Sequence, residues 1–433
     1  MLRRLRGIRG LVGLALLVLA GAVGHRVADI VRGTPVAGVV VVDSLPSPGS
    51  PVFTREAAAA AQVTLSSGNR VRILLDEDLF RDMMGHLRRA RQSILLYSYY
   101  CQPGRLGDQL ADVLAAQARG GVRVFLLGDG FGCREYLNAV GPRLRSAGVR
   151  VAAHRPVRWW QLHRAQHRNH GRVVLVDGTV GYTGGFGIAD DWVGGEDTPP
   201  WRDTNLRIRG PAVAELEAAF TAAWSEATGN LLVLSGEAEP RPMAADPEFP
   251  DVLAGLLVSR PGLGVTTADR YLAYSMSGAT RTLYVANSYF VPTARTRRML
   301  ADAARRGVDV RVLVPGPVND VPGTRWAGQL HFDELLEAGV RIWLYQGTMM
   351  HAKTMVVDGR WGTVGSLNLD NRSLRLNEEW SVVFDDPGLG AALDSLFLAD
   401  LERSRERTVQ EHAARSLWDR VRERLAWVIE PLL

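Results

Sequence analysis

Cysteine is scarce in this chain of 433 residues, which contains only Cys101 and Cys133. Their spacing fits no zinc motif, because a structural zinc ion needs four ligands that come in close pairs. Each cysteine follows an apolar run that is typical of a strand. We favour two separate thiols, and a disulfide is the alternative if the protein folds outside the cytoplasm.

Lysine is rarer still. Of the 51 lysine and arginine residues, Lys353 is the one lysine. Against 46 acidic residues, this gives a net charge of +5 and an isoelectric point near 9.4. Such a balance suits an anionic partner, either phospholipid head groups or nucleic acid, although many basic proteins have neither. The apolar fraction of 46% is ordinary for a globular protein and argues against a disordered chain.

Near the N-terminus, an uncharged apolar run from Leu11 to Gly24 follows a cluster of arginines. The run is shorter than the roughly 20 residues of a membrane-spanning helix. A basic start before a short apolar core is typical of a secretory signal, cleaved near Ala20–Ala22, or of a signal anchor. We favour an anchor in the cell membrane, with the basic end inside and the rest of the chain on the outer side.

Proline-rich breaks divide the chain into segments. We assign residues 1–42 to the basic N-terminus and its anchor, 43–66 to a linker, 67–240 to a first domain, 252–405 to a second domain, and 406–433 to a C-terminal helix. Apolar and charged residues interleave from about 398 to 428, which is typical of amphipathic helices. We favour their packing against the body of the protein over their lying on a membrane surface.

The two domains repeat each other, because matching segments occur in the same order in both. The pairs are Ser93–Tyr100 with Thr282–Phe290, Gly121–Gly128 with Gly307–Val314, Ala147–Arg150 with Ala338–Arg341, and Val173–Gly178 with Thr354–Gly359. Several matches in order indicate a duplicated domain. Apolar, β-branched runs alternate with helix-like stretches, which predicts an α/β fold whose strands are buried on both faces.

The strongest local pattern joins a histidine, a cation two residues later, and an Asp-Gly pair. It consists of His351, Lys353 and Asp358 in the second half and of His170, Arg172 and Asp177 in the first. Side chains two apart on a strand face the same side, so each histidine and its cation can meet one phosphate. Asp-Gly predicts a tight turn. The glycine-rich segment that follows lets backbone amides approach an anion, and we expect phosphate-binding residues there, namely Gly185, Ser366 and Asn368.

Two such modules that face each other would place a histidine on each side of a phosphodiester. One imidazole, neutral, can attack phosphorus, while the other, protonated, donates to the leaving oxygen. Arg172 and Lys353 would neutralise the non-bridging oxygens. This chemistry requires no metal ion or other cofactor, and we expect none.

Each histidine also needs a carboxylate that fixes its tautomer. Asp203 follows His170, and Glu379 follows His351, at similar intervals along the chain. We predict that these two acids orient the histidines; the alternative is that both are solvated surface carboxylates. Arginines interleave the histidines that precede His170 and argue against a metal cluster there: His154, His163 and His167.

These residues resemble the phospholipase D superfamily, whose paired motifs have the form HxKxxxxD, and more narrowly the bacterial cardiolipin synthases. The resemblance covers residues 67–433 and rests on these stretches: Arg168–His170, Gly184–Phe186, Trp201–Thr204, Tyr289–Pro292, His351–Lys353, Val364–Asp370 and Arg372–Asn377. It implies two α/β/α sandwich domains packed as a pseudo-twofold pair. It also places the acids of the two motifs, Asp177 and Asp358, in the catalytic group.

The resemblance further implies a reaction. His170 would form a phosphatidyl-histidine intermediate, with His351 as general acid, and the phosphatidyl group would pass from one phosphatidylglycerol to a second, releasing glycerol. Phosphatidylglycerol, other anionic phospholipids and the membrane are the expected partners, and nucleic acid is not. Competing interpretations are a phospholipid hydrolase, a nuclease-type phosphodiesterase, and a lipid-binding protein without activity.

The first half departs from the family pattern at two positions. Arg172 stands where the family usually has lysine, and Gly187 stands where it usually has asparagine. Arginine keeps the positive charge and can bind phosphate through two nitrogens, but it is bulkier than lysine. Loss of activity is one consequence to consider; we favour a working variant of the site.

Overall fold

The computed structural model describes residues 45–158, 160, 165–234, 251–261 and 265–427, together with 19–21 and 23–24. Most of the apolar run from Leu11 to Gly24, and with it the predicted anchor, lies outside these ranges. Most of the second proline-rich break and residues 428–433 also lie outside them. Within the described ranges, no helix combines the length and the apolar character that crossing a bilayer requires.

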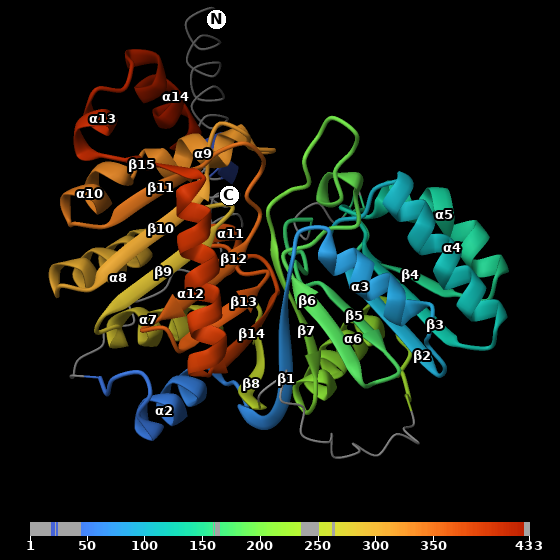
Figure 1. Ribbon diagram of the computed structural model, residues 1–433. Coiled ribbons are helices and arrows are strands. Elements are labelled where there is room, and N and C mark those ends of the chain that lie inside the picture. The colour runs from blue at the N-terminus through green and yellow to red at the C-terminus, as the bar shows by residue number, and fades with distance from the viewer. Residues whose placement is uncertain are drawn as a thin grey trace, which may run out of the picture.

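The strands of the first half form one side of a mixed sheet (Figure 1). In sheet order they are β1 (Ser66–Leu75), β7 (Thr204–Arg209), β6 (Val180–Gly184), β5 (Val173–Val176), β2 (Ser93–Ser98), β3 (Arg123–Asp129) and β4 (Arg150–His154). β2, β3 and β4 are parallel, whereas the pairs from β2 through β5, β6 and β7 to β1 are antiparallel. Every residue of β2 and β5 is buried, as the apolar runs predict.

The second half repeats this order strand for strand. It contains β8 (Asp251–Ser259), β14 (Glu379–Asp385), β13 (Trp361–Gly365), β12 (Lys353–Val357), β9 (Thr282–Asn287), β10 (Asp309–Pro315) and β11 (Arg341–Tyr345). One further strand, β15 (Ser404–Arg407), pairs with the outer edge of β11. The repeated order and the repeated strand directions confirm the prediction of an α/β protein with two similar halves.

Strand β1 joins the two halves. Its first residues pair with β8, where Asn69 lies opposite Val252, and its later residues pair with β7, where Leu75 lies opposite Thr204. All the strands therefore belong to one hydrogen-bonded sheet of 15 strands. β6 and β7 also contact β13 and β14, so the inner strands of the halves lie against each other.

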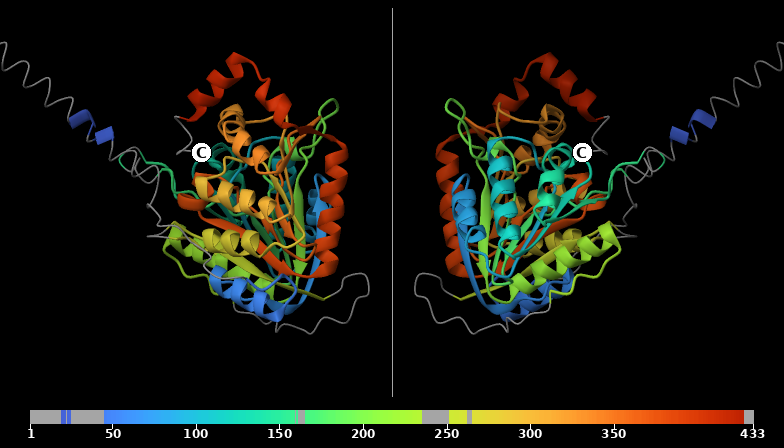
Figure 2. Two further views of the ribbon diagram at one scale, coloured as in Figure 1. Left: turned by 90° about the vertical axis from the view of Figure 1, so that its left-hand side faces the viewer. Right: turned by 90° about the vertical axis from the view of Figure 1, so that its right-hand side faces the viewer.

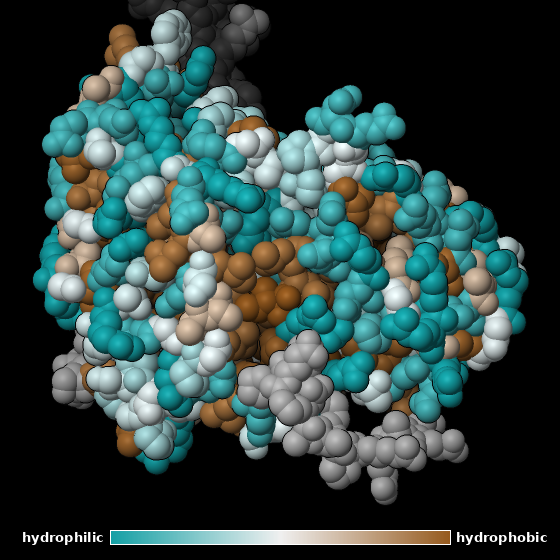
Figure 3. Space-filling model, viewed as in Figure 1, coloured by the Kyte–Doolittle hydropathy of each residue, from teal (hydrophilic) through white to brown (hydrophobic). Residues whose placement is uncertain are grey.

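Helices cover both faces of each half (Figures 1 and 2). In the first half, one face carries α3 (Asp78–Leu87), α4 (Arg105–Arg119) and α5 (Arg134–Ser146), and the other carries α6 (Ala212–Thr228). In the second half, one face carries α7 (Thr267–Gly278), α8 (Ala294–Arg305) and α10 (Phe332–Glu337), and the other carries α12 (Pro387–Glu402). This layering is the α/β/α sandwich expected for each half. Between α12 and α3, apolar side chains gather over the central strands (Figure 3).

Two segments differ from their sequence-based description. Residues 51–61, within the predicted linker, form helix α2 (Pro51–Ala61), whose Phe53 and Ala57 are buried against α7 of the second half. The region predicted as one C-terminal helix contains two short helices, α13 (Val409–Ala413) and α14 (Leu417–Trp427), after strand β15. α14 packs on α9 (Pro322–Gln329), which follows β10.

Cys101 and Cys133 form a disulfide, with their Cα atoms 4.4 Å apart. The prediction of two separate thiols is therefore wrong. The physical reason is tertiary: Cys101 follows β2 and Cys133 follows β3, and these strands are parallel neighbours, so the segments beyond their carboxyl ends meet.

Candidate active site

Each of the two histidines lies just before a central strand. His170 precedes β5, and His351 precedes β12. Backbone hydrogen bonds tie each histidine to the opposite half. The N–H of His170 donates to the carbonyl of Glu378 (2.7 Å), and the N–H of His351 donates to the carbonyl of Arg202 (2.7 Å). These contacts form two short parallel bridges between the halves, at Asn169 with Glu378 and at Arg202 with Met350.

The side chains of the histidines also bind across the halves. Nδ1 of His170 lies 3.0 Å from Oε2 of Glu379, and Nδ1 of His351 lies 3.2 Å from Oδ2 of Asp203. Both carboxylates are fully buried, so the alternative of solvated surface acids is excluded. Each half thus supplies one histidine and the carboxylate for the histidine of the other half.

Further hydrogen bonds hold both carboxylates in place. Glu379 accepts hydrogen bonds from the hydroxyls of Ser366 (2.6 Å) and Ser373 (2.7 Å). Asp203 accepts from the indole N–H of Trp192 (2.8 Å) and from the backbone N–H of Thr204 (2.8 Å). Because their remaining oxygens are occupied, both acids keep a fixed orientation towards the imidazoles.

Each cation lies beside the histidine of its own strand. Nη2 of Arg172 is 3.1 Å from Nε2 of His170, and Nζ of Lys353 is 3.0 Å from Nε2 of His351. Arg172 can only donate, so Nε2 of His170 accepts and its Nδ1 carries the proton that is donated to Glu379. Nζ of Lys353 lies 3.0 Å from both ring nitrogens of His351, so there the carboxylate of Asp203 is what favours a proton on Nδ1. The tautomer of His170 is therefore set from both sides, and that of His351 is set by its carboxylate.

Burial and like charge keep both imidazoles neutral. Burial and the Arg172 cation lower the pKa of His170 to about 4. Burial, Lys353 and Arg172 lower the pKa of His351 well below its usual value. Burial also lowers the pKa of Lys353 to about 7. A bound anion would offset the two cations and so would raise the pKa of both imidazoles.

Four aromatic side chains surround the imidazoles. The ring of Tyr99 meets that of His170 edge-on at 4.8 Å between centroids. Trp192, Trp201 and Tyr289 lie 5.0, 5.6 and 5.8 Å from the ring of His351. Tyr289 begins one of the stretches that carry the family resemblance, whereas the sequence did not single out Tyr99 or Trp192. Tyr99 and Tyr289 are each the last residue but one of the matching segments Ser93–Tyr100 and Thr282–Phe290, and this was the signal that could have identified Tyr99.

The three residues predicted to bind phosphate make different contacts in the structure. The carbonyl of Ser366 lies 3.1 Å from Nδ1 of His170, and its hydroxyl binds Glu379. Gly185 packs so closely on Asp203 that a Cβ there would approach Oδ1 to 2.5 Å. Both therefore help to hold the histidine and carboxylate pairs. Asn368 accepts a hydrogen bond from the hydroxyl of Ser288 (3.1 Å), at the end of β9.

Asp177 and Asp358 do not join the histidines, although the motif placed them in the catalytic group. Their carboxylates accept backbone N–H groups at the far end of the sheet, from Arg91–Ser93 and from Thr280–Thr282 respectively. The physical reason is strand length: each acid is the seventh residue after its histidine along an extended segment, a span of roughly 20 Å. Both acids instead fix the turn after a strand, where they have positive φ angles.

The departures of the first half from the family pattern are explained by packing. Arg172 is fully buried and donates from Nη1 to the carbonyl of His170 (2.5 Å) and from Nε to the carbonyl of Phe186 (2.9 Å). Lys353 makes the equivalent bond to the carbonyl of His351 (2.6 Å). At Gly187, a Cβ would approach the ring of Trp192 to 2.8 Å. An asparagine would therefore displace the indole that holds Asp203.

Other titratable groups near the site have separate partners. His154 lies within 3.3 Å of Glu226, and Nδ1 of His167 lies 3.2 Å from the carbonyl of Leu376. In the described ranges, no three histidine, cysteine or acidic side chains come together as metal ligands would.

The paired histidine-cation strands and the duplicated sheet are those of the phospholipase D superfamily. A family model described as "Cardiolipin synthase, PLD-like domain" matches residues 272–401. Cardiolipin synthase A of Pseudomonas syringae pv. syringae is 33% identical over 375 residues, which cover 85% of this chain and 76% of that protein. Cardiolipin synthase A of Yersinia pseudotuberculosis is 34% identical over 372 residues, covering 84% and 76%. The chain therefore belongs to the cardiolipin synthase family within that superfamily.

Solved structures share the fold at lower identity. Phosphatidylserine synthase of Haemophilus influenzae Rd KW20 superposes with a TM-score of 0.69, covering 88% of this chain and 100% of that one, at 14% identity. Polyphosphate kinase of Porphyromonas gingivalis superposes with a TM-score of 0.52, covering 84% and 53%, at 13% identity. These structures support the arrangement of the two halves and nothing finer.

The crossed carboxylates can be tested by replacing each with its amide. In Glu379→Gln and in Asp203→Asn, the histidine of the other half loses the charge that stabilises its imidazolium form. We expect kcat/KM for phosphodiester turnover to fall by about 10²-fold or more. Glu337→Gln, an exposed site on α10, is the matched control and should leave turnover unchanged. Histidine ¹⁵N shifts should change in the ring that loses its carboxylate and stay unchanged in the other ring. Unchanged turnover in both amide variants would contradict the assignment.

The pKa of Lys353 can be measured directly, because it is the chain's one lysine. Protein without a lysine-containing tag, labelled with ¹³Cε-lysine, should give a single side-chain resonance that titrates at about 7. Lys353 is charged below this pH, so affinity for a dialkyl phosphate, whose charge stays constant, should fall as the pH rises through 7. Bound dialkyl phosphate should move the midpoint upward. A midpoint near the ordinary value of about 10.4 would show that burial does not control this group.

Proposed function

We propose that this protein is a phosphatidyltransferase of the cardiolipin synthase type, which joins two phosphatidylglycerol molecules and releases glycerol. The observation that carries the proposal is the pair of neutral, buried imidazoles, each with a cation at Nε2 and a carboxylate at Nδ1. The family relationship over most of the chain supports the same chemistry.

In the first step, Nε2 of His170 attacks the phosphorus of one phosphatidylglycerol. A P–N bond forms, the P–O bond to the head-group glycerol breaks, and His351 gives its proton to the leaving oxygen. Arg172 and Lys353 turn from the imidazoles to the non-bridging oxygens, where negative charge resides in the transition state. Glu379 stabilises the positive charge that His170 acquires.

In the second step, His351, now neutral, accepts the proton from a terminal hydroxyl of a second phosphatidylglycerol. That oxygen attacks phosphorus, the P–N bond breaks, and His170 returns to its neutral form. Burial of both imidazoles favours the alcohol over water, because His170 and His351 are only 6% and 3% exposed. Transfer to water would give phosphatidate instead.

Lipid substrates require access from a membrane, and helix α14 has the character of a membrane-surface helix. Leu417, Trp418 and Leu425 are 77%, 72% and 66% exposed. Leu417 and Leu425 lie about two turns apart on one side of the helix. Arg420 and Arg424, which lie between them in the sequence, are exposed. Apolar side chains are visible over α13 and α14 at the upper left of Figure 3. An apolar stripe flanked by arginine fits the surface of an anionic bilayer.

The lipid product identifies the function. Purified full-length protein, incubated with vesicles of labelled phosphatidylglycerol, should form cardiolipin and glycerol in equal amounts. His170→Ala should reduce the rate by about 10³-fold or more. Arg172→Lys should stay within about tenfold of the native rate, because the ammonium can keep the bond to the His170 carbonyl as Lys353 does at its own site. Phosphatidate in place of cardiolipin indicates a hydrolase, nicked plasmid DNA indicates a nuclease, and no turnover overturns the proposal.

The membrane contact of α14 is tested by flotation with phosphatidylglycerol vesicles. The double variant Trp418→Asp and Leu425→Asp should lower the bound fraction by about tenfold or more, because two large apolar side chains no longer enter the bilayer. Val52→Asp, which places one aspartate at an exposed apolar site on α2, is the control, and each single variant of α14 is compared with it. Equal flotation of the double variant and the native protein would show that α14 does not contact the membrane.

A further inference from the structure

A hydrogen bond links Tyr289, beside His351, to an exposed carboxylate. The Tyr289 hydroxyl donates to Oδ2 of Asp320 (2.6 Å), and Nζ of Lys353 lies 5.5 Å from the centre of the Tyr289 ring. Asp320 belongs to the loop between β10 and α9 and is exposed. One tyrosine ring therefore separates the imidazole of His351 from a carboxylate that solvent and substrate can reach.

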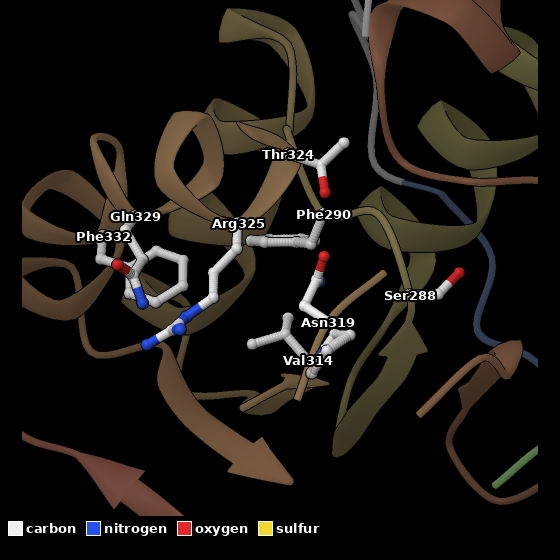
Figure 4. A pocket seen from close by; sticks show the side chains of 9 residues that line it. Ser288, Phe290, Val314, Asn319, Thr324, Arg325, Gln329 and Phe332 are labelled. Carbon is white, nitrogen blue, oxygen red and sulfur yellow. The ribbon is translucent and has the colours of Figure 1, made fainter. Parts of the chain in front are cut away.

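The loop that carries Asp320 is held in place by its neighbours. Oδ1 of Asn319 accepts the N–H of Val321 (2.7 Å), and the Thr324 hydroxyl donates to the carbonyl of Val321 (2.7 Å). Asn319 and Thr324 line a cavity of about 20 Å³ (Figure 4). That volume has room for about one water molecule. The loop therefore has little space to move inward, and Asp320 keeps its place beside Tyr289.

Tyr99, which holds the position of Tyr289 in the first half, meets a different set of charges. Burial and Asp129 raise the pKa of Tyr99, and three arginines lower it: Arg372, Arg172 and Arg168. Asp129 is itself fully buried, and its carboxylate accepts the N–H groups of Phe131 and Gly132. The accessible charge on this side of the site is therefore positive, which suits phosphate oxygens.

Exposed carboxylates from both halves lie on the side of His351. Asp191 directly precedes Trp192, whose ring contacts that of His351, and is exposed. Burial, Asp190 and Asp320 raise the pKa of Asp191, so the carboxylates of Asp191 and Asp320 interact across the boundary of the halves. A carboxylate accepts hydrogen bonds and repels anions. This side of the site therefore suits a neutral group that carries hydroxyls.

We propose that Asp320 determines head-group specificity by accepting a hydrogen bond from a free hydroxyl of the glycerol at the reacting phosphorus. This inference rests on the proposed function. When His170 attacks in line, the leaving glycerol lies on the side of His351, and the incoming glycerol must arrive from that side. Each carries a hydroxyl beyond the reacting oxygen, so one carboxylate serves both. A carboxylate can accept several hydrogen bonds, so the bond from Tyr289 leaves capacity for the substrate.

Competition between two alcohols isolates this contact. Vesicles of phosphatidylglycerol are incubated with the full-length protein and equal concentrations of labelled glycerol and labelled 1-propanol, which lacks the further hydroxyls. Both alcohols meet the same phosphatidyl-histidine, so the product ratio does not depend on donor binding or on the amount of folded protein. The native protein should favour glycerol by about tenfold or more, and Asp320→Ala should lose most of this preference. Asp302→Ala, at an exposed site on α8, is the control and should keep the native ratio.

The charge of Asp320 has a test of its own. Asp320→Asn keeps the shape and an acceptor oxygen but removes the charge. Offered glycerol together with glycerate, its anionic analogue, the native protein should use glycerate about tenfold less, and Asp320→Asn should narrow this difference to about threefold or less. Burial lowers the pKa of Lys353, whereas Asp320 raises it. The lysine resonance should therefore titrate at a lower pH in Asp320→Asn than in the native protein.

The outcomes are distinct. Native product ratios in both Asp320 variants overturn the inference. An unchanged titration of Lys353 in Asp320→Asn also overturns it, because the carboxylate would then lie too far from the site. Equal loss of all products at the native ratio would show that Asp320 serves only the fold, which again overturns the inference. If the native protein forms neither cardiolipin nor exchange products, the proposed function itself fails.

Discussion

The site depends on the crossing of two histidine-carboxylate pairs between the halves. Neither half alone contains a histidine with its orienting acid, because Glu379 serves His170 and Asp203 serves His351. The backbone bridges at Asn169 and Arg202 fix the same crossing one residue away. Packing of the halves and assembly of the catalytic groups are therefore a single event. The inner strands accordingly carry large buried side chains such as Trp380. The Trp380 ring packs so closely on Gly171 that a Cβ on Gly171 would lie 2.3 Å from it.

Burial of the site also requires its charges to balance. Arg172 and Lys353 are buried beside Glu379 and Asp203, so two cations meet two carboxylates in a region with little water. An unpaired charge there would be costly, which is why the imidazoles stay neutral and the pKa of Lys353 falls to about 7. A phosphodiester adds one negative charge and restores the tendency of one histidine to accept a proton. The free site is thus poised to respond to its substrate's charge.

The duplication makes the two histidine-cation pairs alike, while the residues beside them differ. Arg172 and Lys353 make equivalent bonds to the carbonyls of their histidines. Gly187 leaves space for Trp192, whereas Asn368 at the equivalent position accepts a hydrogen bond from Ser288. A reaction that joins two copies of one lipid needs such a difference, because the donor is attacked at phosphorus and the acceptor attacks through oxygen.

The sequence alone determined the α/β class, the order of matching segments, and the histidine-cation strands, because these depend on local periodicity and on repetition within the chain. It left open which acid serves which histidine, and it misjudged three features: the Cys101–Cys133 pair, the role of Asp177 and Asp358, and helix α2 within the expected linker. Each of these depends on which strand ends meet in space. Strand direction and neighbourhood in a sheet are set by long-range pairing, and a local pattern carries no information about that pairing.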